Sequence, residues 1–342
     1  MADRLITHPD QVNLDWLEDV LRHNGYLISG HIASLSTTVT QPFGSITVWI
    51  KVTYTGDAPP DLPATFLLKM DGPGSLAENR EIEFYDHYAA QQPHGITVPC
   101  FDTAYDAGQR AYHLLLADVT STHYVVEREA PPTRVESERM MDTLAAFHAF
   151  WWGKVDDQTP LVDTNLLNAP ADFFGGFVDF MGDRLTAERR SIYERILAAL
   201  PALLYERLAN RANQTLAHDD AHTWNFMQPR ASGHALLIDW QQWGISLGVH
   251  DVAYLITLFW YPDHRQRQEK LMLQRYHARL LEHGVNDYAW EDCWQDYRLY
   301  TLRNMLVPLW AWQMGHWAPH RWVQMEKSMF AFHDLDCSDL LA

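Results

Sequence analysis

The strongest constraint on the fold is a change of hydrophobic pattern about a third of the way along the 342-residue chain. From Tyr26 to Met70 the segments ISGHIASLS, SITVWIKVTYTG and ATFLLKM are β-branched and alternating, with QPFG and GDAPPDLP between them. This alternation predicts three or more antiparallel strands. Beyond about Ser121 the apolar residues recur at helical spacing, which predicts a mostly helical remainder.

Helical patterns also occur before that change. The first covers Asp10 to Asn24 and is closed by Gly25, and a second covers residues 76–90 ahead of two further strand-like runs, residues 96–106 and 109–119. The later helical segments are residues 137–152, 187–210, 249–261, 265–283, 290–312 and 318–333. We therefore expect an α+β chain with a small antiparallel β-rich lobe at residues 1–118 and a larger helical lobe at residues 119–342.

Charge and composition limit the classes of function. A formal charge of −18 argues against a nucleic-acid partner, because neutralising phosphates needs a basic face. The opening residues have no apolar signal-peptide core, and the longest uncharged apolar run, Val252 to Pro262, is too short to span a bilayer. Three widely spaced cysteines predict reduced thiols. These features predict a cytoplasmic protein.

The segment HDDAHTWN carries the most chemical information. It places Asp220 five residues before Asn225, and Asp239 follows in LLIDWQ at the end of an apolar run. Transfer of a phosphoryl group from ATP needs one carboxylate to orient a hydroxyl and accept its proton, and oxygen ligands for Mg²⁺. Asp220 fits the first role, with Asn225 and Asp239 as the metal ligands. Asp219 lies six residues before the asparagine and misses that register.

Two histidines flank these acids. We expect His218 to support the loop, and His222 to hydrogen-bond within it or to approach a phosphate. A different class is also possible, because His218, Asp219 and His222 could ligate a transition metal in a hydrolase. That alternative leaves Asn225 without a role.

The β-rich part contains a second pair of charged residues. Lys69 lies in the apolar strand FLLKM, where an unpaired lysine would be costly, and Glu81 follows twelve residues later on a helix. A strand lysine that contacts phosphates and is held by a helix glutamate is the ion pair that phosphoryl transfer uses. Glu83 is the rival for Lys69, but it lies on another face of that helix.

Two further segments are candidates for nucleotide contacts. QPFGSIT lies between two predicted strands, where the amides of Gly44 and Ser45 could cover the phosphates, although it has a single glycine. The run LLLADV ends the last predicted strand, and adenine would pair there with backbone groups of Leu116, Ala117 and Val119.

These motifs resemble those of the aminoglycoside phosphotransferase and choline kinase superfamily. HDDAHTWN is similar to its H-G-D-x-H-x-x-N loop and LLIDWQ to its metal-binding strand, while ENREIEFY, LLLADV, LAAFHAFWW and GVHDVAYLI also resemble family segments. The tail GVNDYAWEDCWQDYR and IDWQ are most similar to the bacterial branch related to ecdysteroid-kinase-like (CHK-kinase-like) proteins. The resemblance runs from about residue 30 to residue 310. It implies a protein-kinase-like two-lobe fold and an ATP- and Mg²⁺-dependent kinase that phosphorylates a small-molecule alcohol.

The resemblance also implies an acceptor site between the catalytic loop and the C-terminal helices. Aromatic and polar residues gather there, and the candidates are Trp310, Trp312, His316 and Trp317. Aminoglycosides would need carboxylates, choline an aromatic cage, and a steroid- or macrolide-like alcohol apolar walls. One departure stands out, because Asp219 occupies the position where the family has glycine. A catalytically degenerate, nucleotide-binding relative is therefore an alternative.

Overall fold

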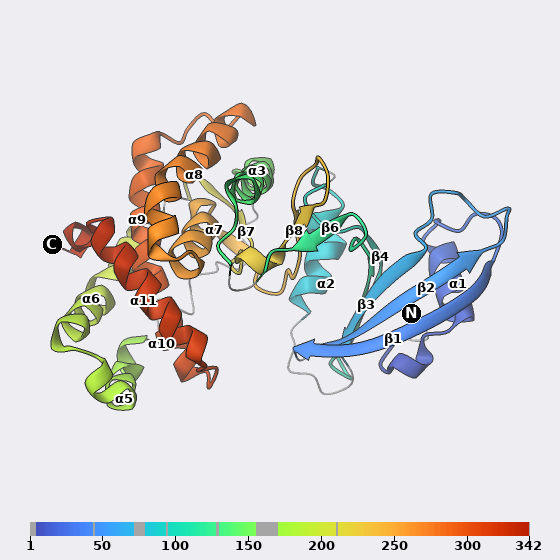
Figure 1. Ribbon diagram of the computed structural model, residues 1–342, viewed down its shortest axis with the longest axis horizontal. Helices are drawn as coiled ribbons and strands as arrows, with labels where there is room; N and C mark the ends of the chain where they lie inside the picture. Colours follow the sequence, from blue (N-terminus) through green and yellow to red (C-terminus); the bar gives the residue numbers. More distant parts are fainter. Residues whose placement is uncertain are drawn as a thin grey trace. The chain divides into compact units, whose positions relative to one another are not determined.

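The computed structural model describes residues 5–43, 45–71, 79–93, 95–127, 130–154, 170–209 and 211–341. Contacts within the chain divide it into two compact units. Unit 1 comprises Met1–Tyr124, Pro229–Ser232 and Ile238–Gln241, and unit 2 comprises Val125–Gln228, Gly233–Leu237 and Gln242–Ala342. Figure 1 labels the helices and strands along the sequence.

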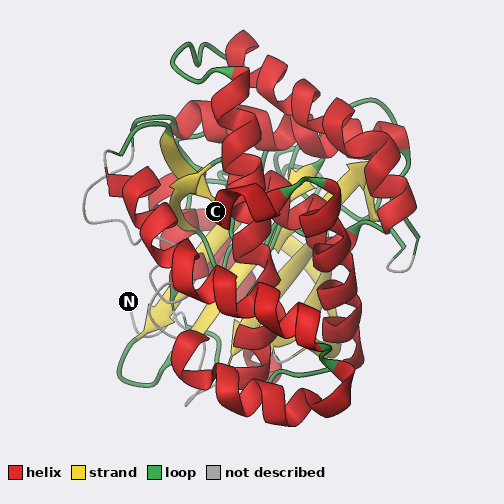
Figure 2. Ribbon diagram, turned by 90° about the vertical axis from the view of Figure 1, so that its left-hand side faces the viewer, coloured by secondary structure: helices red, strands yellow, loops and turns green. Residues whose placement is uncertain are grey.

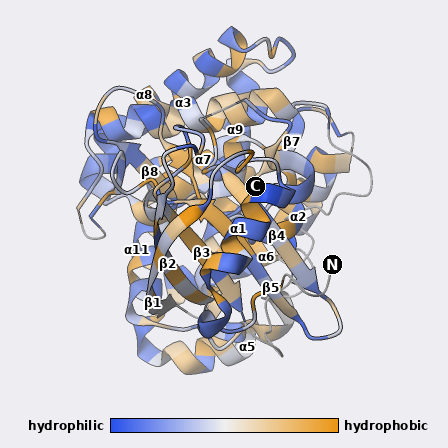
Figure 3. Ribbon diagram, turned by 90° about the vertical axis from the view of Figure 1, so that its right-hand side faces the viewer, coloured by the Kyte–Doolittle hydropathy of each residue, from blue (hydrophilic) through white to orange (hydrophobic). Residues whose placement is uncertain are grey.

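Unit 1 is built on a five-stranded antiparallel sheet in the order β1-β2-β3-β5-β4. The strands are β1 (Ile32–Phe43), β2 (Ser45–Tyr54), β3 (Thr65–Asp71), β4 (Cys100–Asp106) and β5 (Ala111–Ala117). Alternate residues of β2 (Val48, Ile50 and Val52) are buried, as a strand with one face on a core requires. The strands carry the apolar colouring in Figure 3.

Two helical segments pack in unit 1. Helix α1 (Leu14–His23) follows η2 (Pro9–Gln11). Asn13 caps its N-terminus, because its side chain accepts a hydrogen bond from the amide of Trp16. The helix buries Leu17 and Val20 in a core that it shares with the sheet. The other segment, predicted as one helix over residues 76–90, is α2 (Arg80–Phe84) followed by the π-helical turn η3 (Tyr85–Ala89). Residues 76–78 of that prediction lie outside the described part of the chain.

Unit 2 is mostly helical, and Figure 2 draws the helices of the chain in red and its strands in yellow. The helices are α3 (Arg134–Trp151), α5 (Pro170–Met181), α6 (Ala187–Ala209), α7 (Val249–Tyr254), α8 (Pro262–Glu282), α9 (Trp290–Met305), α10 (Val307–Gln313) and α11 (Pro319–Asp334). Shorter turns are η4 (Gly182–Arg184), η5 (Thr223–Asn225), η6 (Leu255–Phe259) and η7 (Cys337–Leu341).

The remaining strands are short. β7 (Gln214–Ala217) pairs antiparallel with β10 (Gly244–Leu247), and β8 (Phe226–Pro229) pairs with β9 (Leu236–Leu237). β6 (His123–Val125) spans the point where the sequence passes from unit 1 to unit 2. The predicted α+β class, with an antiparallel β-rich N-terminal region and a mostly helical C-terminal region, is confirmed.

Three helix predictions need correction. The single helix expected over residues 290–312 is divided between α9 and α10, because Pro308 lacks the amide hydrogen that a continuing helix needs. The segment expected over residues 249–261 is α7 followed by the π-helical turn η6. Helix α5 was missed, because its sequence PADFFGGFVDFM contains a proline and two glycines. No helix of the described residues is long and apolar enough to cross a membrane.

Candidate functional site

In unit 1 the sequence-predicted partner of Lys69, Glu81, lies close to it, and so does Asp239, which was predicted as a metal ligand. Its Nζ donates to Oε2 of Glu81 at 2.7 Å and to Oδ1 of Asp239 at 2.8 Å. Strand β3 presents the lysine, helix α2 presents the glutamate, and the segment Ile238–Gln241 brings the aspartate from far along the sequence. The expected Lys69–Glu81 ion pair is therefore present, with a second carboxylate on the same ammonium.

The two carboxylates stabilise the charged form of Lys69, whereas burial raises the pKa of Glu81 itself. The side chain of Lys69 is 17% exposed and that of Glu81 is 5% exposed, so both have lost most of their hydration. Burial disfavours the charged lysine, but the carboxylates of Glu81 and Asp239 outweigh it and raise the pKa of Lys69 above its usual range. The result is a buried ammonium held between two carboxyl groups.

Asp239 adopts an unusual backbone conformation. Its φ is +67°, in the left-handed region that aspartate tolerates better than most residues. The next residue anchors the segment, because the Trp240 ring stacks on Phe84 of α2 with centroids 3.8 Å apart and its amide donates to Oε1 of Glu81 at 3.3 Å. The buried tryptophan thus places the Asp239 carboxylate against Lys69.

The other predicted nucleotide contacts also lie in unit 1. Ser45 begins β2 and its hydroxyl is 3.3 Å from the Tyr112 hydroxyl, whereas Gly44 lies outside the described residues. Leu116 and Ala117 end β5. The Ala117 amide donates to the Pro99 carbonyl, and the Val119 carbonyl accepts from two amides of the following turn. Adenine pairing at this segment stays a prediction.

In unit 2 the loop 218–225 connects β7 to β8 and includes η5, and one buried carboxylate accepts hydrogen bonds from its backbone. Asp251, on α7, accepts from the amide of His218 at 2.7 Å and from the amide of Asp219 at 2.9 Å. It also lies 3.1 Å from Nε2 of His148 on α3. Burial opposes ionisation of this carboxyl, yet His148 and neighbouring histidines lower the pKa of Asp251 to about 2. The Asp251 side chain that holds the loop is therefore a carboxylate anion at neutral pH.

The Asp220 carboxylate is oriented by two neighbours. The Tyr254 hydroxyl, at the end of α7, donates to Oδ1 at 2.9 Å. The Asn225 amide nitrogen donates to the Asp220 carbonyl at 2.8 Å and lies 3.4 Å from Oδ2. Because that nitrogen faces Asp220, the amide oxygen of Asn225 is the atom left for a cation.

The two predicted supporting histidines have different contacts. His218 is fully buried, and its Nδ1 accepts from the Asp220 amide at 3.3 Å, which supports the loop from inside. Nε2 of His222 lies 3.7 Å from Oδ2 of Asp220, and its ring contacts Trp224 and Phe259. His222 therefore lies beside the Asp220 carboxylate and next to two aromatic rings.

Asp219, the residue in place of the family's glycine, is engaged by two basic side chains. Its Oδ1 accepts from Nη2 of Arg303 on α9 at 2.8 Å and lies 3.0 Å from Nε2 of His250 on α7. These contacts occupy the carboxylate that a transition-metal hydrolase would use. Within the described residues, no three His, Cys, Asp or Glu side chains are grouped to hold a metal.

The predicted acceptor residues form part of an aromatic cluster. Trp312, on α10, and Trp317, just after it, contact Phe177 and Phe180 of α5, with ring centroids 5.3–6.1 Å apart. Trp310 is half-buried, and His316 is exposed, with its amide bonded to the Ala311 carbonyl. Of the four predicted acceptor residues, Trp312 and Trp317 therefore pack against the same two phenylalanines. None of the contacts described above for Asp220 involves any of the four.

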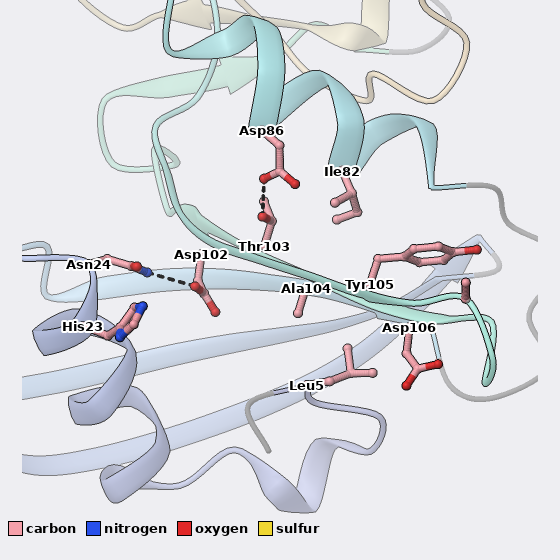
Figure 4. A pocket seen from close by; sticks show the side chains of 11 residues that line it. Leu5, His23, Asn24, Ile82, Asp86, Asp102, Thr103, Ala104, Tyr105 and Asp106 are labelled. Atoms are coloured by element: carbon pink, nitrogen blue, oxygen red, sulfur yellow. Dashed lines mark hydrogen bonds between the residues drawn. The ribbon is translucent and has the colours of Figure 1, made fainter. Parts of the chain in front are cut away.

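Unit 1 also contains a cavity of about 840 Å³ outside these clusters. It is lined by the end of α1, by β4 and by α2, and none of the predicted site residues lines it. In Figure 4 the Asp86 side chain points to Thr103, and the Asn24 amide points to Asp102. Its acidic side chains thus have partners within the protein.

Sequence reasoning did not assign roles to Asp251, Tyr254, Arg303 or His148. A signal existed in GVHDVAYLI, because an aspartate in an otherwise apolar helix must be partnered when it is buried. Arg303 lies in a helix that carries many charged residues, so its sequence context gave no such signal.

With this geometry established, comparison with known proteins decides the family. The model of the ecdysteroid kinase-like family matches residues 79–285, which include Glu81, the loop 218–225, Asp239 and Asp251. The chain belongs to the ecdysteroid kinase-like family. Among curated proteins, none matches this member of the family.

Solved structures share the fold of this ecdysteroid kinase-like chain at low sequence identity. A putative aminoglycoside phosphotransferase from Ralstonia eutropha JMP134 is 12% identical, covers 96% of this chain and 98% of its own, and has a TM-score of 0.61. A microcompartment-associated aminopropanol kinase is 13% identical to this chain, and the match covers 96% of this chain and 99% of that one, with a TM-score of 0.57. An ADP-bound aminoglycoside phosphotransferase is 11% identical to this chain, and the match covers 94% of this chain and 96% of that one, with a TM-score of 0.50. The predicted protein-kinase-like fold is confirmed.

Proposed function

We propose that the protein is an ATP- and Mg²⁺-dependent kinase that phosphorylates a hydroxyl of a small molecule. The observation that carries this proposal is the state of Asp220. Its carboxylate is oriented by the Tyr254 hydroxyl, which donates to Oδ1, and by the amide nitrogen of Asn225, which lies five residues further along the chain. A carboxylate held in this way can accept a proton from an attacking hydroxyl.

The residues of unit 1 fit a nucleotide. Lys69 is fixed and charged, as contact with the α- and β-phosphates requires, and Glu81 holds it from the side of α2. Ser45, at the start of β2, would add a hydroxyl and an amide near the phosphates. Adenine would meet the backbone of Leu116, Ala117 and Val119.

The donor set also fits Mg²⁺, which prefers carboxylate and amide oxygens and retains water or phosphate oxygens for its other positions. Asp239 and Asn225 would each provide one oxygen. When bound, the metal neutralises charge that develops on the transferred phosphate. Lys69 would exchange its contact with the Asp239 carboxylate for the phosphates, which frees that carboxylate for the cation.

The chain's own residues would perform the remaining steps. Asp220 would align the acceptor hydroxyl and take its proton as the oxygen attacks phosphorus, while Tyr254 keeps the carboxylate in place. His218 would hold the loop, and His222 would stabilise it or contact a phosphate. Trp310, Trp312, His316 and Trp317 would border the acceptor. The three cysteines are free thiols, which supports a reducing, cytoplasmic setting.

An ADP-release screen with Mg-ATP tests this function. The acceptors to compare are aminoglycosides, amino alcohols, sugars, macrolides and sterols. With a responsive acceptor, Asp220→Asn should lower kcat by roughly a thousandfold, because the base is lost. The control Asp263→Asn alters only an exposed ion pair with Arg267 and should leave turnover unchanged.

Three other outcomes would change the assignment. Full activity in Asp220→Asn would remove that residue as the base. A thermal shift with Mg-ATP but no ADP release with any acceptor would favour the degenerate, nucleotide-binding relative. A shift with a transition metal alone, and none with Mg-ATP, would favour a metal-dependent hydrolase.

A further inference from the structure

We propose that Asp219 is a positioning residue that fixes the catalytic loop to α9 through its ion pair with Arg303. The pair would stabilise the left-handed turn that a glycine could adopt without help. The inference rests on the proposed function of Asp220, the next residue in the chain. It assigns a role to the position at which this sequence departs most clearly from the family's motif.

The backbone at Asp219 has a conformation that glycine adopts most readily. Asp219 has a φ of +60°, in the left-handed region that glycine enters without cost and aspartate enters at a modest one. Its amide donates to Asp251, which fixes the turn from the side of α7. A non-glycine side chain here must therefore either point into solvent or gain contacts that offset the strain.

The side chain gains such contacts. The Asp219 carboxylate is 14% exposed and Arg303 is 3% exposed, so the pair joined at 2.8 Å is largely removed from water. His250 is fully buried, and its Nε2 lies 3.0 Å from the same carboxylate oxygen, close but not aligned as a hydrogen bond. An arginine buried to this degree is costly without an anion, and Asp219 supplies one.

The contacts continue from this pair to the strands that frame the loop. The His250 ring stacks on Tyr300 of α9, with centroids 4.7 Å apart. The Tyr300 hydroxyl lies 2.7 Å from the Ser246 hydroxyl on β10, and β10 pairs with β7, the strand that leads into the loop. The loop is thus tied to α9 twice, once through Arg303 and once through β7.

This arrangement has two consequences for the neighbouring Asp220. Arg303 compensates the charge of Asp219, so that two adjacent carboxylates do not repel each other in the loop. The pair also fixes the peptide between residues 219 and 220, from which the Asp220 side chain projects. A displacement of about 1 Å at that point can cost about a hundredfold in rate.

Two readouts test the role of the pair. Hydrogen exchange of the peptide that covers residues 218–225 reports loop order without any substrate. ADP release with the acceptor found in the screen reports kcat and the KM for ATP separately. The variants are Asp219→Gly, which restores the family's residue but removes the anion, and Asp219→Asn, which keeps an acceptor and tolerates the left-handed turn.

For Asp219→Gly we expect loop exchange to be faster by on the order of tenfold, and kcat to fall by roughly a hundredfold with the KM for ATP unchanged. Asp219→Asn, which keeps a hydrogen-bond acceptor for Arg303 but not the charge, should change both quantities by less than Asp219→Gly does. Arg303→Lys, which keeps the charge, provides a second perturbation should the glycine variant fold poorly. As the matched control, Asp296→Asn alters another ion pair of α9, with Arg207, and should change neither loop exchange nor kcat.

Unchanged loop exchange in both Asp219→Gly and Arg303→Lys would overturn the positioning role, whatever happens to turnover. So would an equal effect of Asp296→Asn, since the response would then be a general effect of weakening α9. Should the wild-type protein release no ADP with any acceptor, the kinase proposal fails, and the exchange data still decide whether the pair orders the loop.

Discussion

Asp251→Asn should destabilise unit 2 by removing the anion beneath the loop 218–225. The carboxylate, which has no exposed surface, meets the amides of His218 and Asp219 and the imidazole of His148 at 2.7–3.1 Å. Asparagine can accept through one oxygen only, and its amide nitrogen would then face another donor. One buried charge-assisted hydrogen bond is worth about 1.5–3 kcal/mol, and an unsatisfied buried amide costs about 1–3 kcal/mol. We expect a loss of about 3–5 kcal/mol at neutral pH.

The loss should depend on pH in a defined direction. The folded-state pKa of Asp251 is lowered to about 2 from an ordinary value of 3.8. A lowered folded-state pKa means that the carboxylate stabilises the protein fully above its unfolded-state pKa and ceases to do so as the pH falls through its folded-state pKa. The wild-type protein should therefore lose about 2–3 kcal/mol from this group between about pH 4 and about pH 2, and the variant should lack that contribution.

Urea unfolding followed by tryptophan fluorescence measures this difference, because most of the 14 tryptophans lie in unit 2. The control Asp263→Asn changes an exposed pair and should cost less than about 1 kcal/mol. A loss under about 1 kcal/mol for Asp251→Asn would refute the anchoring role. So would a gap between wild type and variant that stays constant from neutral pH to about pH 2.

Three further predictions follow from the packing and the charges. Gly248→Ala would place a Cβ 2.7 Å from Nδ1 of His148 and against a buried tyrosine hydroxyl, so we expect a loss of at least about 2 kcal/mol in urea unfolding. Gly175→Ala, in α5 with nothing within 4 Å of the new Cβ, should instead raise stability by about 0.5–1 kcal/mol. Equal effects of the two would contradict the packing argument. Glu81→Gln should weaken Mg-ATP binding roughly tenfold by calorimetry, because Lys69 loses a charged partner, and an unchanged Kd would contradict that role.

Patterns in the sequence predicted those features that depend on residues close together in the chain. The alternation in β2 and β3, the helical spacing after residue 121 and the register of Asp220 with Asn225 each depend on residues close together in the chain. The Lys69–Glu81 pair was accessible as well, since a lysine in a buried strand requires an anion nearby. The division of the helix at Pro308 was predictable in principle, because proline removes a backbone donor.

Other features required contacts between distant segments. Nothing near Lys69 in the sequence indicates that Asp239 reaches the same ammonium, because the segment Ile238–Gln241 is placed by the stacking of Trp240 on Phe84. The sequence also left Asp219 as an unexplained departure from glycine, since its partner Arg303 is 84 residues away.

The sequence by itself therefore determined the fold class, the order of the chemical residues and the kind of reaction they favour, because those properties follow from periodicity, residue type and short spacings. The tertiary structure decided which groups each of the three carboxylates contacts. Asp219 is paired with Arg303, Asp251 is committed to two backbone amides, and Asp220 is oriented by Tyr254. The physical reason is that the state of a carboxylate depends on burial and on the charges around it, and both are set by packing between residues far apart in the chain.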